Sequence, residues 1–218
     1  MGRPSLKDQR RLDLIRACIQ SIHEDGPEGA SLARIAGRAN LTAGIVGHYF
    51  ADKAELMEAT MRFLGRELGR ETAQRLSAAA TPRERVLAVI DANLSPEQFR
   101  PDTSAVWLAF WGRVNHSPRL GHLQRINTAR LHSNLRHALR QALPGQDDAV
   151  RRITLGLSTL IDGLWLRAAL DNGGIDPAET RALAAHYLST ALREAEAEER
   201  PAVAQERAPN SDRESVHD

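Results

Sequence analysis

Apolar residues recur at intervals of three and four positions along most of the chain, and this spacing limits the possible fold more than any other feature. We find no segment that alternates apolar and polar residues as a half-buried strand does. Alanine, leucine, arginine and glutamate, which favour helix, are abundant. We therefore predict an all-α protein, and its 218 residues are enough for a small domain followed by a larger one.

Capping residues and helix breakers divide this pattern into separate helices. The predicted helices span residues 8–24, 31–39, 43–48, 53–71, 82–94, 104–115, 120–143, 147–170 and 177–198. Gly26 is expected to end the first helix. Asn40 is expected to form the turn after the second helix, because asparagine tolerates a left-handed backbone. Asp52 followed by Glu55 is typical of a capped helix start.

The run SLARIAGRANLTAGIVGHYF, residues 31–50, predicts two short helices joined by a tight turn. Small residues at Ala36 and Gly44 allow these helices to cross closely at a steep angle. The second helix of such a unit lies in the major groove of DNA, with its first residues toward the base edges. Because those residues are Thr42, Ala43 and Gly44, we expect few side-chain hydrogen bonds to the bases.

Several other side chains around this unit are suited to contacts with the DNA backbone. Lys53 stands at the start of a predicted helix, where backbone N–H groups and an ammonium group can hold a phosphate together. Arg34 and Arg38 are four residues apart and share one helix face. Each charge taken alone could be an ordinary solvated side chain, so the prediction depends on the whole set. The candidate DNA contacts are Arg34, Arg38, Thr42, Ala43, Gly44, Gly47, His48, Tyr49 and Lys53.

The N-terminal end of the chain forms a basic arm. The first eleven residues contain Arg3, Lys7, Arg10 and Arg11 against Asp8 alone. The formal net charge of the whole chain is only +1, which by itself argues neither for nor against nucleic acid. The position of the arm is what favours a DNA partner.

Residues 31–56, with YFADKAEL at their end, resemble the tetracycline-repressor family. The resemblance implies a helical regulator with a three-helix DNA-binding domain and a divergent C-terminal domain. It also implies dimeric binding to a palindromic operator, usually as a repressor that a ligand releases. Asn40-Leu41 departs from the Gly-Val that is frequent in the family, and Gly47 is small for its position, so the base preference stays open.

Three regions follow from this organisation. Residues 1–55 are expected to form the helix-turn-helix DNA-binding domain, and residues 56–198 a helical domain for ligand binding and dimerisation. Residues 199–218 contain prolines and charges but few large apolar side chains. Because such a segment buries too little to become ordered, we expect a disordered tail.

All three tryptophans lie in the larger domain, although aromatic residues make up only 4% of the chain. Trp107 and Trp111 are four residues apart and share a helix face, with Phe110 beside them. Trp165 follows Asp162 by three residues on another predicted helix. If the two helices meet, rings and carboxylate would form a box for a quaternary ammonium, which relies on cation–π attraction. The alternative is that the tryptophans are core residues and that the carboxylate pairs with a neighbouring arginine.

WLAFW at 107–111 and LIDGLWLRAAL at 160–170 resemble the choline-responsive branch of the same family, and the similarity extends over residues 8–195. It implies repression of genes for choline uptake and for choline oxidation to glycine betaine, a response to osmotic stress, with choline as the releasing effector. The alternative is a repressor of the same family that answers another cationic or hydrophobic effector, as in efflux or lipid metabolism. The candidate effector contacts are Trp107, Phe110, Trp111, Asp162 and Trp165.

The helices at 147–170 and 177–198 are expected to pair with their twofold mates in a homodimer. A dimer of this kind sets the recognition helices about 34–36 Å apart, one turn of DNA. The alternative is that the same apolar faces form a core within one chain. The faces contain Leu157, Leu160, Ile161, Leu164, Leu183, Tyr187 and Leu188.

The main rival class, a small enzyme such as a hydrolase, has no support. The chain contains no nucleophile elbow and no glycine loop that would hold phosphates. Its eight histidines lack the spacing of helical metal pairs, and His132 and His137, for example, are five residues apart. We therefore expect no enzyme activity, no cofactor and no metal.

The same sequence points to the cytoplasm and to no membrane contact. Cys18 is the single cysteine, so an internal disulfide is impossible and we expect a buried apolar residue there. The N-terminus is polar and basic, unlike a signal peptide. The longest apolar stretch, 153–170, is interrupted by Asp162 and Arg167, which makes it too polar to span a bilayer unaided.

Overall fold

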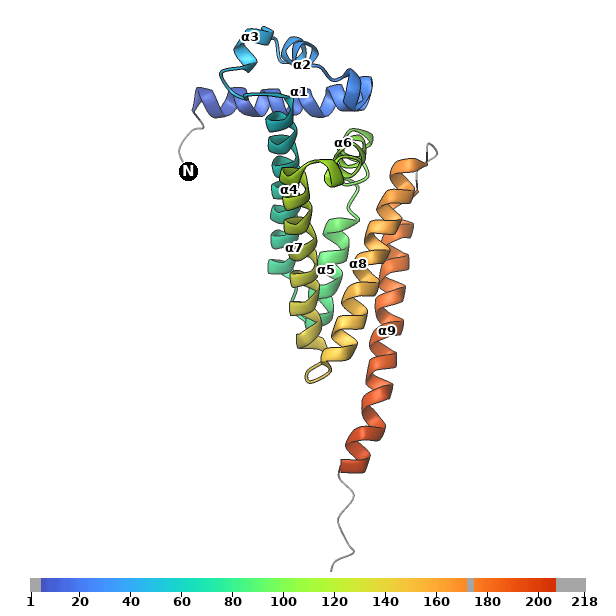
Figure 1. Ribbon diagram of the computed structural model, residues 1–218. Helices are drawn as coiled ribbons and strands as arrows, with labels where there is room; N and C mark the ends of the chain where they lie inside the picture. The colour runs from blue at the N-terminus through green and yellow to red at the C-terminus, as the bar shows by residue number, and fades with distance from the viewer. Residues whose placement is uncertain (1–4, 172–174, 207–218) are drawn as a thin grey trace, which may run out of the picture.

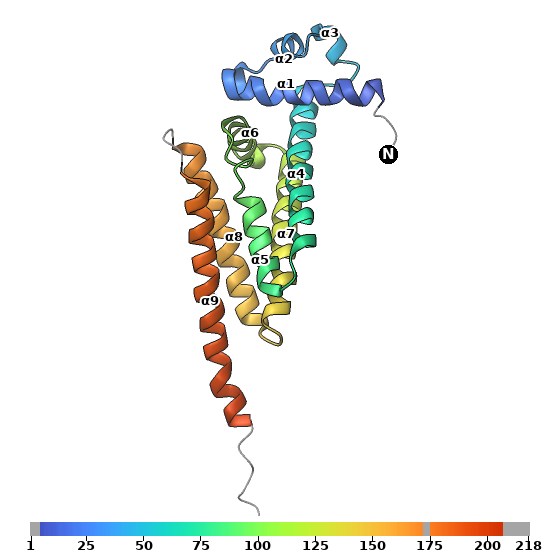
Figure 2. The same ribbon diagram turned by 180° about the vertical axis from the view of Figure 1, so that it is seen from behind.

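The computed structural model describes residues 5–171 and 175–206, and these residues form helices without any strand. The helices are α1 (Leu6–Gly29), α2 (Leu32–Arg38), α3 (Ala43–Val46), α4 (Lys53–Ala78), α5 (Pro82–Asn93), α6 (Pro101–Trp111), the 3-10 turn η1 (Val114–His116), α7 (Pro118–Ala142), α8 (Asp147–Leu170) and α9 (Pro177–Glu206). The all-α prediction is confirmed. Figures 1 and 2 show α1 lying across one end of α4, with α2 and α3 on its outer side and the longer helices on the other.

One hydrophobic core joins the N-terminal helices to the larger domain. Ile35 of α2 and Val46 of α3 are both fully buried in it. The same core contains Phe110 of α6 and Trp165 of α8, so it crosses the expected domain boundary at residue 55, which falls inside α4. Cys18 of α1 is buried there as expected, and burial raises the pKa of its thiol. The two predicted domains are therefore packed directly on each other.

A second core holds the larger domain together. It is formed where α5, α7, α8 and α9 pack side by side. Val89, Leu135, Leu157 and Leu188, one from each of these helices, are all fully buried. Burial of a leucine-sized side chain contributes roughly 1.5–3 kcal/mol. This core therefore supplies the rigid body on which the tryptophan helices rest.

The helix boundaries differ from prediction where caps were overlooked. α1 begins before residue 8 because Ser5 and Asp8 form a reciprocal capping box. Its regular part ends where predicted, since Gly26 has a φ of +72°. α6 begins at Pro101 rather than at residue 104, because proline has the fixed φ of a first helical residue and needs no N–H partner there.

α9 continues to Glu206, past residue 199, where the tail is expected to begin. Residues 194–199 are glutamate and alanine, both good helix formers, and they carry the helix onward. Figure 1 shows this end of α9 extending beyond the other helices. The rest of the predicted tail, 207–218, lies outside the described residues.

The faces expected to form the dimer interface are only partly free. Leu157, Ile161 and Leu188 lie in the core of the single chain, because α8 packs on both α7 and α9. Leu160, Leu164 and Tyr187 are partly buried against the same core, and Leu183 is 49% exposed. The large apolar side chains that α8 and α9 leave exposed are Leu155, Leu166, Leu170 and Leu183.

α8 is long and apolar enough to cross a membrane by length and composition alone, with a mean hydropathy of 1.3 over its best window. The packing of α8 within the chain also accounts for its apolar composition. One face lies in the chain's own core, and the other carries the exposed leucines Leu155, Leu166 and Leu170.

Candidate DNA-binding surface and ligand cavity

The turn between α2 and α3 has the geometry that its sequence predicts. Asn40 has a φ of +54°, in the left-handed region. The backbone N–H of Leu41 donates to the carbonyl oxygen of Ala36 at 2.9 Å, which closes the turn. Ser31 caps α2 by accepting from the N–H of Arg34 at 3.3 Å. Two short helices are thus held at a fixed angle, as in a helix-turn-helix.

α3 lies at the outer end of the molecule, opposite the far end of α9 (Figure 1). It ends at Val46, two residues earlier than predicted, and Gly47 follows as its C-cap. Among the predicted contacts around it, Tyr49 is partly buried and the others are exposed. The exposed ones are Thr42, Ala43, Gly44, Gly47 and His48. Ile45 was not among the predicted contacts. Its side chain is 36% exposed, so it can make an apolar contact with a thymine methyl group.

Arg11 of α1 fixes the residues that follow α3. Its guanidinium donates to the carbonyl oxygen of Tyr49. The same group lies over the ring of Phe50, 4.2 Å from the ring centroid, in a cation–π contact. One residue of the basic arm therefore positions the recognition unit instead of extending toward a phosphate.

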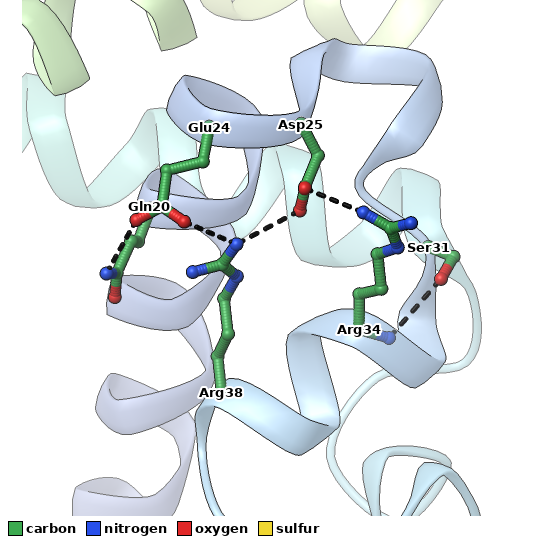
Figure 3. Close-up of polar contacts among 6 residues, drawn as sticks. All are labelled: Gln20, Glu24, Asp25, Ser31, Arg34 and Arg38. Atoms are coloured by element: carbon green, nitrogen blue, oxygen red, sulfur yellow. Dashed lines mark hydrogen bonds and ion pairs between the residues drawn. The ribbon is translucent and has the colours of Figure 1, made fainter.

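The two arginines of α2 are held by acidic residues at the end of α1 (Figure 3). Arg34 donates to Asp25 at 2.7 Å, and Arg38 lies 3.2 Å from Asp25 and 2.6 Å from Glu24. Hydrogen bonds from Gln20 and Arg38 lower the pKa of Glu24, and the bond to Glu24 raises the pKa of Arg38. In the absence of DNA, the two charges predicted to meet phosphates are thus neutralised by carboxylates.

Lys53 is engaged in a similar way. Its Nζ donates to the carbonyl oxygen of Pro27 at 2.6 Å, which ties the start of α4 to the end of α1. Asp52 caps α4 by accepting from the N–H of Glu55 at 2.7 Å, as its sequence predicts. Lys53 therefore stands at a capped helix start, but its amine is turned toward α1.

A cavity of about 90 Å³ lies inside the larger domain, between α4, α5, α6, α7 and α8. The rings of Trp111 and Trp165 stand edge to face in its wall, with centroids 4.9 Å apart. Trp107 lies 6.4 Å from Trp111 and 6.2 Å from Trp165. The helices that carry the tryptophans therefore do meet. Phe110, the fourth predicted ring, is fully buried behind Trp107 and does not line the cavity.

Hydrogen bonds fix the orientation of two of these rings. Trp165 donates its Nε1–H to the backbone carbonyl oxygen of Gln98 at 3.0 Å. Trp111 donates to Oε1 of Gln124 at 3.3 Å. Because both indole N–H groups already donate to neighbouring lining residues, ring faces and edges remain for a ligand.

Asp162 stands at the exposed rim of the cavity, and His132 is the other titratable residue among its described lining residues. Burial of the carboxylate by the surrounding protein raises the pKa of Asp162, and the charge of His132 lowers it in part. His132 Nε2 lies 3.0 Å from Oγ of Ser158. Asp162 makes no ion pair with Arg167 among the described contacts, so the pairing considered from the sequence is not found.

Several lining residues could not be found from the sequence. They come from segments far apart in the chain, and none forms a recognisable spacing with the tryptophans. They are Leu68, Asn93, Gln98, Gln124, Asn127, Thr128, Leu131, His132 and Ile161. Most are neutral and polar, so the wall opposite the rings offers hydrogen bonds without charge.

α6 connects the cavity to the DNA-binding surface. Trp107 and Trp111 lie on its cavity side, while Leu108 and Gly112 lie against the end of α1. The Arg113 guanidinium, just after α6, pairs with Glu28 of α1. α6 thus contacts both the cavity and the end of α1 that holds Arg34, Arg38 and Lys53.

A helix-turn-helix domain packed on a helical body defines a DNA-binding regulator built from helices alone. Residues 14–60 match the bacterial regulatory proteins of the tetR family, and residues 82–193 match the C-terminal domain of BetI-type transcriptional repressors. The HTH-type transcriptional regulator BetI of Burkholderia cenocepacia is 44% identical over 193 residues, which cover 88% of this chain and 98% of that protein. BetI of Burkholderia lata matches to the same extent. The chain therefore belongs to the tetR family, and it is a transcription regulator, not an enzyme.

Solved structures share the fold at low sequence identity. A transcriptional regulator from Pseudomonas aeruginosa superposes with a TM-score of 0.73 at 23% identity, covering 85% of this chain and 91% of that one. A regulator from Saccharomonospora viridis, determined in complex with choline, gives 0.73 at 18% identity, covering 83% and 96%. At these identities the likeness concerns the fold alone.

Proposed function

We propose that this protein is a repressor that leaves its operator when a small quaternary ammonium compound, choline, enters the tryptophan cavity. The observation that carries the proposal is the composition of the wall: three tryptophans, one carboxylate and, among the described lining residues, neither lysine nor arginine. Such a wall attracts a cation that cannot donate hydrogen bonds.

The electrostatics of the rim favour the same ligand. The raised pKa of Asp162 indicates that its carboxylate is costly to charge in the empty cavity. A cation bound beside it offsets that cost, whereas an anionic ligand would increase it. The uncharged amides of Asn93 and Asn127 can accept or donate to an alcohol group. A compound with an ammonium head and a hydroxyl end suits both walls.

The size of the cavity favours a small effector over a large lipophilic one. Its volume of about 90 Å³ holds several water molecules, while sites for drug-sized ligands occupy about 300–1,000 Å³. The choline complex of the Saccharomonospora viridis regulator supports the choice of ligand, since that protein has the same fold. Resemblance to the choline-responsive branch extends the proposal to genes for choline uptake and for oxidation to glycine betaine.

The operator is proposed to be an inverted repeat bound by a homodimer in the cytoplasm. The exposed leucines of α8 and α9 supply an apolar surface for the partner. In the bound state, Arg34, Arg38 and Lys53 exchange their contacts with α1 for phosphates, while α3 enters the major groove. Choline shifts α6 and the end of α1, and so favours the state that does not fit the DNA.

The test is an operator-release titration. DNA fragments bound by the purified protein are enriched from genomic DNA, the protected repeat is mapped by footprinting, and its affinity is measured by fluorescence anisotropy. Choline chloride, glycine betaine and a larger lipophilic cation are then added separately. We expect release by choline alone. Release only by the larger cation would favour the rival function in efflux or lipid metabolism, and absence of a protected repeat would contradict DNA binding.

Matched variants locate the response in the cavity. Trp111→Ala removes one ring face and should weaken choline binding at least about tenfold while sparing operator affinity. Asp162→Asn keeps the side-chain volume and should weaken it similarly. Asp148→Asn, on the same helix but exposed and paired with Arg151, is the control. Unchanged choline response in both cavity variants would reject this site.

A further inference from the structure

The tryptophan cavity shares a wall with a second, larger hollow. This cleft, about 750 Å³ in volume, lies between α1, α4 and the segment 97–103. Gln98 lines both the cleft and the tryptophan cavity, and it is the residue common to the two sets of described lining residues. The cleft and the tryptophan cavity therefore meet at Gln98.

The backbone of Gln98 is held firmly, but its side chain is not. Its N–H donates to the carbonyl oxygen of Ser95 at 2.9 Å, and its carbonyl oxygen accepts from Trp165 Nε1 at 3.0 Å. The residue is only 9% exposed, yet none of the described hydrogen bonds holds its amide group. Because no described hydrogen bond fixes this amide, which borders both hollows, the side chain can change its rotamer at little cost. Rotation about its side-chain bonds can open the wall without moving the backbone.

Most of the carboxylates that line the cleft are ion-paired, and Glu97 is the exception among the described ion pairs. The pairs are Glu24 with Arg38, Glu67 with Arg70 and Asp102 with Arg100. Glu97 is exposed and stands next to Gln98 in the chain. Its carboxylate can therefore attract a cation to this end of the cleft.

We infer that the cleft is the access path of the cationic effector when the partner subunit covers the cavity rim at Asp162, and that Gln98 is the gate between cleft and cavity. This inference rests on the proposed function, because it concerns the same cavity. The gate sets the rates at which the ligand enters and leaves, and it contributes little to the affinity itself. Gln98 is thus a positioning residue of the access path and not one of the rings that hold the ammonium group.

The test is stopped-flow tryptophan fluorescence of the full-length protein mixed with choline chloride. Gln98→Ala shortens the gate, so association and dissociation rate constants should both rise about tenfold while Kd changes less than about threefold. Gln98→Met keeps the volume and should restore the wild-type rates, because a gate acts through its bulk. Gln20→Ala, a cleft residue outside the tryptophan cavity, is the matched control and should leave the rates unchanged.

A second variant tests the charge of the cleft. Glu97→Gln should lower the association rate constant two- to fivefold at low salt, less at high salt, and leave the dissociation rate constant unchanged. Circular dichroism and operator binding without choline verify folding in every variant.

The outcomes separate this inference from the proposed function. If the wild type binds choline but Gln98→Ala leaves both rates unchanged, the gate is wrong and the proposed function stands. If Gln98→Met instead weakens Kd as much as Gln98→Ala, the amide is a ligand contact and the gate is again wrong. If the wild-type protein shows no saturable choline signal, the proposed function fails and the gate fails with it.

Discussion

At the scale of single residues, the arginines that we propose as DNA contacts already have partners. Asp25 is 14% exposed and contacts Arg34 and Arg38 together. Each arginine must break its contact with Asp25 before it can bind a phosphate. In the free protein, the carboxylate of Asp25 therefore competes with operator phosphates for the two arginines.

Replacing Asp25 with asparagine should strengthen operator binding. We expect a two- to fivefold lower Kd and a steeper decrease of affinity with salt, because Arg34 loses its carboxylate partner and Arg38 keeps only Glu24. Fluorescence anisotropy at several salt concentrations measures both effects, with Asp148→Asn as the control. Weaker binding by a correctly folded Asp25→Asn protein would mean that the carboxylate positions the arginines for DNA.

Asp162 should make the proposed choline binding depend on pH. Its pKa is raised in the folded protein, so the empty protein gains stability as pH falls through that pKa, opposite to an ion-paired carboxylate. Choline requires the charged form, so its affinity should fall as pH falls through the same range.

Isothermal titration of choline between neutral and acidic pH measures this dependence. In the wild type, affinity should decrease on acidification, and binding near the raised pKa should release protons. His132→Gln should retain the part of the pH dependence that is due to Asp162, and Asp162→Asn should lose that part. A pH dependence that survives in Asp162→Asn and disappears in His132→Gln would assign the effect to the histidine alone.

At the scale of helices, α8 and α9 approach closely at a glycine. A Cβ atom added at Gly156 would lie 1.9 Å from Oη and 2.7 Å from Cζ of Tyr187. The absence of a side chain at this position thus makes room for the tyrosine ring. Elsewhere a glycine inside a helix costs about 1 kcal/mol relative to alanine, so here the packing outweighs helix propensity.

Gly156→Ala should destabilise the protein by roughly 1–2 kcal/mol, since the ring of Tyr187 must shift. Gly69→Ala, in α4 with nothing within 4 Å, should instead stabilise it by up to about 1 kcal/mol. Urea unfolding at fixed protein concentration compares the two. Adding Tyr187→Leu to Gly156→Ala should recover part of the lost stability. Equal stabilisation by Gly156→Ala and Gly69→Ala would contradict the close contact between Gly156 and Tyr187.

At the scale of the whole molecule, the proposed operator binding requires two copies, and we propose that they meet at the exposed leucines. Leu155 is 62% exposed on α8 and Leu183 is 49% exposed on α9. Apolar side chains gathered on neighbouring helices mark an interaction surface. Asp162 lies on the exposed side of α8 between Leu155 and Leu166, so the cavity rim borders this surface.

Leu155→Glu combined with Leu183→Glu should therefore give a monomer. Sedimentation velocity measures the oligomeric state, and operator affinity should fall at least about tenfold because only one half-site is bound at a time. Arg130→Glu, on the exposed side of α7, changes charge elsewhere and should leave the dimer intact. A stable dimer in the double variant would place the interface on another face.

The sequence by itself determined the helical class, most helix boundaries and the recognition unit. These depend on local physics: apolar spacing, a capping Asp52, a breaking Gly26 and a left-handed Asn40 each act within a few residues. The pairing of Trp107 with Trp111 was equally local. Local patterns also favoured the proposal of an aromatic box, because helical spacing places such residues on one face.

Only the tertiary structure decided which surfaces remain free. It placed Phe110 behind the cavity, put Leu157 and Ile161 in the core of one chain, and turned Arg34 toward Asp25. Each outcome depends on which distant segment of the chain packs against that side chain. Helical periodicity determines the face of the helix on which a residue lies, but it does not determine which segment packs on that face. Gln98 shows this most clearly, since its two cavities are formed by six segments that meet only when the chain is folded.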